Sequence, residues 1–495
     1  MNEKASGGPQ QGSARLPAVV TIPHTAEGRP ARLVTLFGRV DARGSKQAHY
    51  IFDGGRPAYA EVVLPADGSL RSLTLQTPAA AWHERELHDQ FGIHIVGHPD
   101  LRPLIFHENW PEGVHPMVDA VSDVPWSNRS YRFLEVQGEG VAEVGVGPVH
   151  AGIIEPGHFR FSVVGDTILH LELRHFYTHK GTEKLFQGRT VADGVMLAES
   201  VSGDNCFAHA VCYCQAAETA LGRNAPPRAM AIRLIGLELE RLVCHISDVG
   251  GLCTDVGFAV AAACATRIKE SLLEASAQCC GTRYWRGIAV PGGLRRDFES
   301  ARLAELARAV AGASTEFANL ASMILETPSI QNRFEGAGIL SSETARDLGV
   351  VGPVARASGI DYDVRREHPY GGYGHQMEVP TTHYGDVMAR ARIRIGEAAI
   401  SARLIQETAG VLPEGSIFEP VAAGGEAQGF SAVESPRGEL LYWLEVRGGR
   451  LARCHIQSPS FQNWPAMPFA VADNIIADFP LINKSFNLSY SGCDR

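Results

Sequence analysis

The stretch "PRAMAIRLIGLELERLVCHISDVGG", residues 227–251, decides the fold of the C-terminal part of this chain. Proline at a helix start and glycine just past a helix end are common, so the stretch predicts a helix over 227–249 that stops at Gly250–Gly251. Steps of three, four and three residues place four polar side chains on one stripe of this helix. They are Glu238, Arg241, His245 and Asp248.

Two interpretations of this polar stripe are open. It can be a solvated face held by ion pairs three residues apart. It can instead line the inside of a helical bundle, where charged groups persist only if they are paired. The opposite side of the helix is predicted to be apolar, through Ile235, Leu239, Leu242 and Ile246.

The surrounding sequence predicts a mostly helical domain over 147–495 with flanking β-sheets. Two β-hairpins are expected, one turning at Gly165–Asp166 and one at Gly448–Gly449, because alternating apolar residues flank each turn. Further helices are expected at 206–221, 256–280, 298–326 and 384–410.

The N-terminal part has a different pattern. From about Ala31 to Gln76 apolar residues alternate between Gly, Pro and Asp turns, and a short helix is expected in 79–93. This combination predicts a small α+β domain, so the fold class of the whole chain is α+β. The predicted organisation is a flexible leader (1–30), the α+β domain (31–120), a linker (121–146) and the helical domain (147–495).

Composition limits the possible functions. A chain of 495 residues needs two or more domains, and its net charge of −10 argues against nucleic-acid binding. The longest apolar run, residues 256–265, is about half the ~20 residues that span a bilayer, and no signal peptide is expected. We therefore expect ten free thiols in a cytoplasmic protein that sits on a membrane partner.

Two absent motifs exclude cofactor chemistry on this chain alone. No G-x-G-x-x-G follows a predicted strand, so a nicotinamide or flavin fold is not supported. No two cysteines have C-x-x-C spacing, so an iron–sulfur cluster is not expected either. The loop "GPVHAGIIEPGHFRF", residues 147–161, instead presents His150, Glu155 and His158 from a rigid Gly/Pro-rich backbone.

Several stretches together resemble a known pair of proteins. "WHERELHDQFGIHIVGHPDLRPLIFHENWPEG" (82–113) resembles the 30 kDa subunit of respiratory complex I, NADH-quinone oxidoreductase. "HKGTEKL", "LELERLVCHISDVGGLCTDVGF", "GPVARASGIDYDVRREHPYGGY", "SPRGELLYW" and the closing "DR" resemble its 49 kDa subunit and the large subunit of group 4 membrane-bound [NiFe]-hydrogenases. "IIEPGHF" and "CFAH" favour the branch of hydrogenase 4 and formate hydrogenlyase.

The resemblance also implies that the cysteine ligands of a metal centre are missing. In these hydrogenases two Cys-x-x-Cys pairs hold nickel and iron, and the matching positions here are Ser202, Asn205, Ser489 and Gly492. Cys206 and Cys493 each lie one residue beyond a lost ligand. Because hydroxyls and amides cannot replace soft thiolates, we expect no nickel–iron centre and no metal site.

The quinone site of the complex I branch is matched in part. His158 matches its loop histidine and Asp255 its aspartate, whereas its tyrosine position holds Gly203. The resemblance therefore gives His158 and Asp255 catalytic roles. Further residues are expected to form the wall of one cavity, where the loop of His150 and His158 meets 199–209 and 485–495. They are His150, Glu155, Ser202, Asn205, Cys206, His209, Glu238, Arg241, His245, Arg356, Ser489, Cys493, Asp494 and Arg495.

The tail and the polar stripe are expected to meet in this region. Buried charges must be paired, so Asp494 and Arg495 should contact Glu238, Arg241, His245 or nearby backbone. The alternative is a core that these side chains fill, with no cavity left.

Two functions follow from the resemblance. The first is a nickel-free subunit of a membrane-bound, complex I-related oxidoreductase that passes electrons from a small iron–sulfur subunit to a quinone-type acceptor. The second is a structural coupling subunit of an ion-pumping complex without redox chemistry; hydrogenase activity is not expected under either.

No cofactor would be covalently bound, and NAD and iron–sulfur clusters would belong to partner subunits. The remaining partners would be antiporter-related and quinone-site membrane subunits, with this chain peripheral on the cytoplasmic face of the inner membrane.

Overall fold

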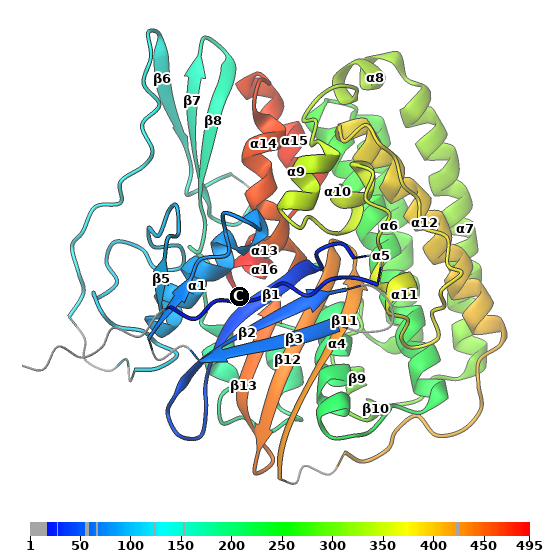
Figure 1. Ribbon diagram of the computed structural model, residues 1–495. Helices are drawn as coiled ribbons and strands as arrows, with labels where there is room; N and C mark the ends of the chain where they lie inside the picture. Colours follow the sequence, from blue (N-terminus) through cyan, green and yellow to red (C-terminus); the bar gives the residue numbers. More distant parts are fainter. Residues whose placement is uncertain are drawn as a thin grey trace, which may run out of the picture.

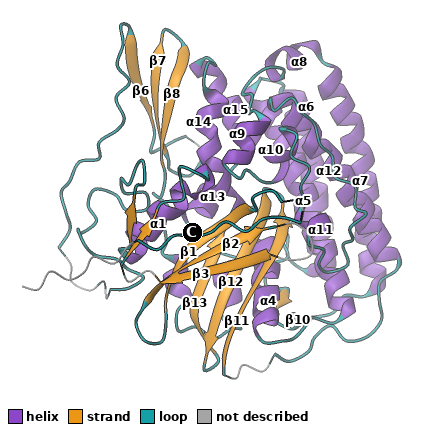
Figure 2. Cartoon of the chain, in the orientation of Figure 1, coloured by secondary structure: helices purple, strands orange, loops and turns teal. Residues whose placement is uncertain are grey.

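The computed structural model describes residues 17–26, 28–54, 59–65, 68–119, 121, 125–151, 154–421 and 425–495. Two antiparallel sheets lie against each other, and long helices pack beside them (Figures 1 and 2). The α+β class predicted from the sequence is confirmed. Among the described helices, none is both long enough and apolar enough to cross a membrane.

The N-terminal sheet consists of β1 (Arg32–Val40), β2 (Lys46–Asp53) and β3 (Tyr59–Pro65), in that order. Helix α1 (Ala81–Phe91) follows a 3₁₀ turn, η1 (Pro78–Ala80), and packs on β1, while β4 (Ser69–Arg71) pairs in parallel with β5 (His94–Val96). Both faces of β1 are buried because α1 covers one face and the C-terminal sheet covers the other.

The predicted boundaries of the N-terminal domain differ from those in the structure. Most of the leader, residues 1–16, lies outside the described residues, but Ala18 pairs with Leu70 of β4. The predicted linker contains β6 (Val141–Val146), which pairs with β7 (His158–Val164) and so belongs to the following sheet. That sheet is completed by β8 (Thr167–Arg174), with the hairpin turn where the sequence predicts it.

Four long helices form the bundle at the right of Figure 1. They are α5 (Pro227–Asp255), α6 (Ala259–Cys280), α7 (Ser300–Glu326) and α12 (Val387–Gly410). Shorter helices join or cover them: α8 (Pro328–Phe334), α9 (Ser342–Asp347), α10 (Gly352–Ala357) and α11 (Val364–Glu367).

The predicted end of α5 is wrong. The helix continues through Gly250–Gly251 to Asp255. A Cβ on Gly250 would lie 2.7 Å from the Cβ of Ala265, so this glycine allows α5 and α6 to pack closely rather than ending the helix. Buried residues occur all around α5, so its expected apolar and polar sides are both inside the protein.

The C-terminal sheet consists of β11 (Glu426–Ser435), β12 (Gly438–Arg447) and β13 (Arg450–Gln457), and the turn predicted at Gly448–Gly449 joins the last two. Helix α4 (Cys206–Ala220) packs on β11 and β12.

The remaining elements are α2 (Thr182–Phe186), α3 (Gly194–Ala198), β9 (Ala289–Val290), β10 (Gly293–Leu294), α13 (Pro459–Asn463), η2 (Trp464–Ala466), α14 (Met467–Val471), η3 (Ile476–Asp478), α15 (Phe479–Phe486) and α16 (Tyr490–Asp494).

Candidate functional site

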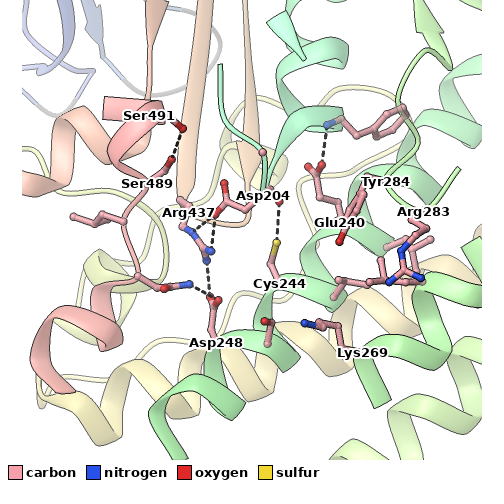
Figure 3. Close-up of a pocket in the computed structure, with 18 of the residues that line it drawn as sticks. Asp204, Glu240, Cys244, Asp248, Lys269, Arg283, Tyr284, Arg437, Ser489 and Ser491 are labelled. Atoms are coloured by element: carbon pink, nitrogen blue, oxygen red, sulfur yellow. Dashed lines mark hydrogen bonds and ion pairs between the residues drawn. The ribbon is translucent and has the colours of Figure 1, made fainter. Parts of the chain in front are cut away.

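A cavity of about 600 Å³ lies where α5, α6, the segment before α4 and the C-terminal tail meet (Figure 3). We call it the α5 cavity. Its apolar lining includes Phe207, Leu239, Val243, Leu273, Trp285 and Leu488. Its polar and charged lining includes Glu155, Asp204, Glu240, Cys244, Asp248, Lys269, Arg283, Tyr284, Arg437, Lys484, Ser489 and Ser491.

The segments expected to converge do meet at this cavity. The hydroxyls of Ser202 and Ser489, which the resemblance places at metal-ligand positions, lie 2.9 Å apart. The backbone N–H of Gly492 donates to the Ser489 hydroxyl over 2.9 Å. The loop of the 147–161 stretch joins them, because the backbone N–H of Ser491 donates to the Glu155 carboxylate over 2.9 Å. The alternative of a filled core without a cavity is therefore wrong.

These residues do not fit a nickel–iron centre. Ser202 and Ser489 present hydroxyls that already hydrogen-bond each other, and Gly492 presents no side chain. The side chain of Asn205 offers only an amide, and its buried Oδ1 has no hydrogen-bond partner among the described residues. No group of three or more His, Cys, Asp or Glu side chains in the described part of the chain could hold a metal ion. Soft thiolates are what this centre requires, and hydroxyls and amides do not replace them.

The neighbouring thiols do not replace the lost ligands either. Cys206 and Cys493 are fully buried, and burial raises the pKa of both thiols far above the ordinary value. The Cys206 thiol donates to the backbone carbonyl of Tyr284 over 3.5 Å. A thiol held protonated in this way is a weak metal ligand, since the thiolate is the binding form.

One wall of the cavity is a charged cluster. Arg437, from the turn between β11 and β12, donates to Asp204 over 2.7 Å and also pairs with Asp248. Arg394 of α12 donates to Asp248 over 3.1 Å, and Asn487 donates to its other oxygen. Burial opposes ionisation of Asp248, but the two guanidiniums outweigh it and lower its pKa. Asp248 is therefore ionised and held by these three neighbouring side chains.

About two turns of α5 before Asp248, the lining carries an isolated carboxyl group. Glu240 of α5 accepts hydrogen bonds from the backbone N–H groups of Phe207 (2.7 Å) and Ala208 (3.0 Å), at the start of α4. Burial raises the pKa of Glu240 to about 8, and the nearby charge of Asp204 adds to the shift. Its pKa differs from that of Asp248 because no described Arg, Lys or His forms an ion pair with it.

The polar stripe predicted on α5 is buried, so the solvated-face interpretation is wrong and the bundle interpretation is confirmed. Glu238 pairs with Arg365 over 3.1 Å and with Arg241 over 3.3 Å, and His245 lies 2.9 Å from Glu397. These three stripe residues do not belong to the lining of the α5 cavity. Only Asp248, at the end of the stripe, reaches it.

The expected contact between the tail and this stripe is not formed. Arg495 pairs with Glu86 over 2.7 Å and donates to the backbone carbonyl of Ile456 over 2.6 Å. Asp494 accepts from the Thr178 hydroxyl over 2.7 Å. The tail charges therefore hold the N-terminal part and the segment before α2, not the centre of the bundle. Arg356, also expected in the wall, pairs with Glu397 over 2.7 Å inside the bundle.

The predicted histidines and Asp255 lie outside the cavity lining. His150 and His158 contact backbone carbonyls of their own loop, at 2.7 Å and 3.2 Å. His209 contacts the Tyr442 hydroxyl over 2.8 Å, and burial lowers its pKa to about 3. Asp255 is exposed at the end of α5. The catalytic roles of His158 and Asp255 stay a prediction.

Sequence reasoning missed most of the polar lining. On α5 a pattern was available, because steps of four lead from Gly236 to Glu240, Cys244 and Asp248, and all four line the cavity. No local pattern identifies Lys269 on α6 or Lys484 on α15, since each reaches the cavity only through tertiary packing.

The chain resembles known proteins over nearly its whole length. It matches the family "Respiratory-chain NADH dehydrogenase, 30 Kd subunit" over residues 16–122 and the family "Respiratory-chain NADH dehydrogenase, 49 Kd subunit" over 255–423 and 418–495. It is 32% identical to "Formate hydrogenlyase subunit 5" of Escherichia coli (strain K12), over 97% of this chain and 87% of that protein. It is 33% identical to "Hydrogenase-4 component G" of the same strain, over 86% and 75%.

A solved structure supports the same relationship. A chain of the membrane-bound sulfane sulfur reductase, an archaeal respiratory membrane complex, aligns with a TM-score of 0.67 at 25% identity, over 72% of this chain and 99% of that one. The fold and its cavity thus define a large subunit of the complex I and hydrogenase type. The chain belongs to the family in which the 30 kDa-type and 49 kDa-type subunits of respiratory-chain NADH dehydrogenase are fused, close to the formate hydrogenlyase and hydrogenase 4 subunits.

Proposed function

We propose that this chain is the acceptor-binding subunit of a membrane-bound, complex I-related oxidoreductase, and that it works without nickel. Electrons would come from a small iron–sulfur partner subunit and pass to a quinone-type acceptor in the α5 cavity. The observation that supports this most directly is the cavity itself. It is open at the place where the metal ligands are replaced by the Ser202–Ser489 hydroxyl pair.

The cavity has the composition of a site for a flat, mostly apolar headgroup. Its volume of about 600 Å³ is within the usual range for small-molecule pockets. Phe207, Leu239 and Trp285 provide apolar walls, and Tyr284 and Lys269 are potential donors to a carbonyl oxygen. NAD and iron–sulfur clusters would be bound by partner subunits, because this sequence has neither binding motif.

The relatives support the proposed setting. One is a subunit of formate hydrogenlyase, and another belongs to an archaeal respiratory membrane complex. We propose that this chain is likewise peripheral, on the cytoplasmic face of the membrane. Its partners would be the iron–sulfur subunit, a quinone-site membrane subunit and antiporter-related membrane subunits.

We expect the purified complex to reduce a short-chain quinone after its clusters have been reduced with dithionite and the excess dithionite has been removed, because dithionite itself reduces quinones. The assay follows quinol formation optically. As a control, the hydroxyl-pair variant Ser202→Ala should retain assembly, since it removes a single hydrogen-bonding group. A complex that carries reduced clusters but forms no quinol would contradict the proposal.

We expect less than about one nickel per ten chains in the purified complex, because thiolates are missing at all four ligand positions. Elemental analysis of the complex checks this. Iron should be present only in the amount that the partner's clusters require. About one nickel per chain would contradict the nickel-free assignment.

The second candidate function is a coupling subunit without redox chemistry. It is favoured by the buried ionic network that begins at the cavity wall and continues through the bundle. Asp248 is in the wall, His245 lies one turn away, and Glu397 joins His245 to Arg356. Such a subunit would support ion pumping by its complex while quinol formation stays absent, so the quinone assay separates the two functions.

A further inference from the structure

The structure assigns a chemical role to Glu240: we propose that its carboxyl group donates a proton to the acceptor reduced in the α5 cavity. This inference rests on the proposed function, because it names the proton donor of that reaction. Glu240 lines the cavity from α5, facing the start of α4 (Figure 3).

The surroundings of Glu240 differ from those of the other cavity carboxylates. Arg437 pairs with both Asp204 and Asp248, and its charge lowers the pKa of Asp248. Glu155 accepts a backbone hydrogen bond from the tail. Glu240 lies in a desolvated position without a salt bridge to any described residue, which raises its pKa to about 8. With a pKa of about 8, the Glu240 carboxyl group is mostly protonated at neutral pH.

The charged and titratable groups around Glu240 come from several elements. Asp204 and Cys206 face it from the segment that leads into α4, and Cys244 and Arg241 belong to its own helix. The remaining charged or titratable residues of the cavity lining are Glu155, Asp248, Lys269, Arg283, Tyr284, Arg437, Lys484 and Tyr490.

The backbone around Glu240 favours rapid loss and recovery of the proton. The N–H groups of Phe207 and Ala208 already point at the carboxyl group from the first turn of α4. Hydrogen bonds from a helix N-terminus strengthen when the acceptor becomes an anion. The ionised form is thus stabilised at the moment when the proton leaves, without any reorganisation.

The step balances with groups already named. Two electrons arrive from the iron–sulfur partner and reduce the quinone. The O–H bond of Glu240 breaks as an O–H bond forms on one quinone oxygen. The second proton enters from solvent through the mouth of the cavity, and solvent later reprotonates the Glu240 carboxylate.

The test compares Glu240→Gln with the wild-type complex, each with its clusters pre-reduced and the excess reductant removed before a short-chain quinone is added as acceptor. The glutamine amide keeps a carbonyl oxygen for the two backbone N–H groups but has no acidic proton. We expect the rate of quinol formation by the pre-reduced complex to fall about 100-fold or more, with little change in the quinone Kd. The wild-type rate should fall as the pH rises through about 8, and the variant should lack this decline.

Glu199→Gln is the matched control. Glu199 is buried, its pKa is also raised by burial, and it accepts the backbone N–H of Gly287 over 2.7 Å, but it does not line the cavity. We expect this variant to keep the wild-type rate and pH profile. Equal rates and equal pH profiles for Glu240→Gln and wild type would overturn the inference and leave the proposed function intact.

Two further outcomes are also decisive. A wild-type complex with reduced clusters that forms no quinol overturns the proposed function and this inference with it. If Glu240→Gln does not assemble, the pH dependence of the wild-type rate still tests the inference. A wild-type rate that stays constant between pH 7 and about pH 9 excludes a proton donor with the pKa of Glu240.

Discussion

Replacing Glu397 by glutamine is expected to lower the free energy of unfolding by about 3–5 kcal/mol, a large part of the stability of a typical protein. The Glu397 carboxylate is fully buried. It lies 2.7 Å from Arg356, 2.9 Å from His245 and 3.7 Å from Arg241. Removing its charge leaves two buried guanidiniums with less compensation, and burial of an unpaired charge is far more costly than loss of the contact itself.

The matched control for this change is Glu378→Gln. Glu378 pairs with Arg403, on the same helix α12 as Glu397, over 2.9 Å, but the two side chains are 73% and 49% exposed. Solvent screens such a pair, so a loss of at most about 1 kcal/mol is expected. Urea unfolding of the full chain, followed by circular dichroism, measures both variants. Equal losses for the two would show that the buried network does not hold the bundle together.

The effect of Glu397→Gln should also depend on pH. Burial opposes ionisation of Glu397, but the adjacent Arg356 and His245 outweigh it and hold the pKa well below the ordinary value of 4.5. A carboxyl group with a lowered folded-state pKa stabilises the protein above its unfolded pKa and loses that contribution as the pH falls. The difference between wild type and Glu397→Gln should therefore be full at pH 7 and shrink below about pH 4.5.

Gly352→Ala is expected to destabilise the protein by at least about 3 kcal/mol and to disturb the α5 cavity. Gly352 starts α10 with a φ of 71°, and a Cβ there would lie 2.3 Å from the carbonyl oxygen of Arg437. Because backbone cannot yield as a flexible side chain does, the turn that carries Arg437 must shift. Asp204 and Asp248 would then lose the guanidinium that holds them at the cavity wall.

Gly336→Ala is the control for Gly352→Ala, because it keeps the left-handed backbone conformation but introduces no steric clash. Gly336 has a φ of 75°, but a Cβ there would meet no described atom within 4 Å. The left-handed conformation alone should cost about 1–2 kcal/mol. Quinone affinity measured with both variants adds a functional comparison, in which only Gly352→Ala should weaken binding. An equal loss of stability in the two variants would show that the Gly352–Arg437 contact is not important.

Local patterns in the sequence were sufficient for much of the fold. The hairpin turns at Gly165–Asp166 and Gly448–Gly449, the start of α4 and the length of α7 follow from turn residues and periodicity within about 30 residues. The family and the absence of C-x-x-C pairs were also evident from sequence, since both depend on residue identity and spacing. The convergence of Ser202 with Ser489 was expected only from the resemblance, which implies one metal site for both segments.

Which face of α5 meets the cavity was decided by tertiary structure alone. Two stripes on this helix carry charged residues, and the stripe singled out from sequence pairs instead with residues more than 100 positions away, such as Glu397 and Arg365. The glycines at 250–251, which resemble a helix end, serve close packing against α6 and Lys484. The sequence by itself determined most of the elements, the α+β class and the absence of C-x-x-C pairs. The cavity lining, the partners of Arg495 and the protonated state of Glu240 depend on which distant side chains share a buried volume, because desolvation and ion pairing are set by all the neighbours in space rather than along the chain.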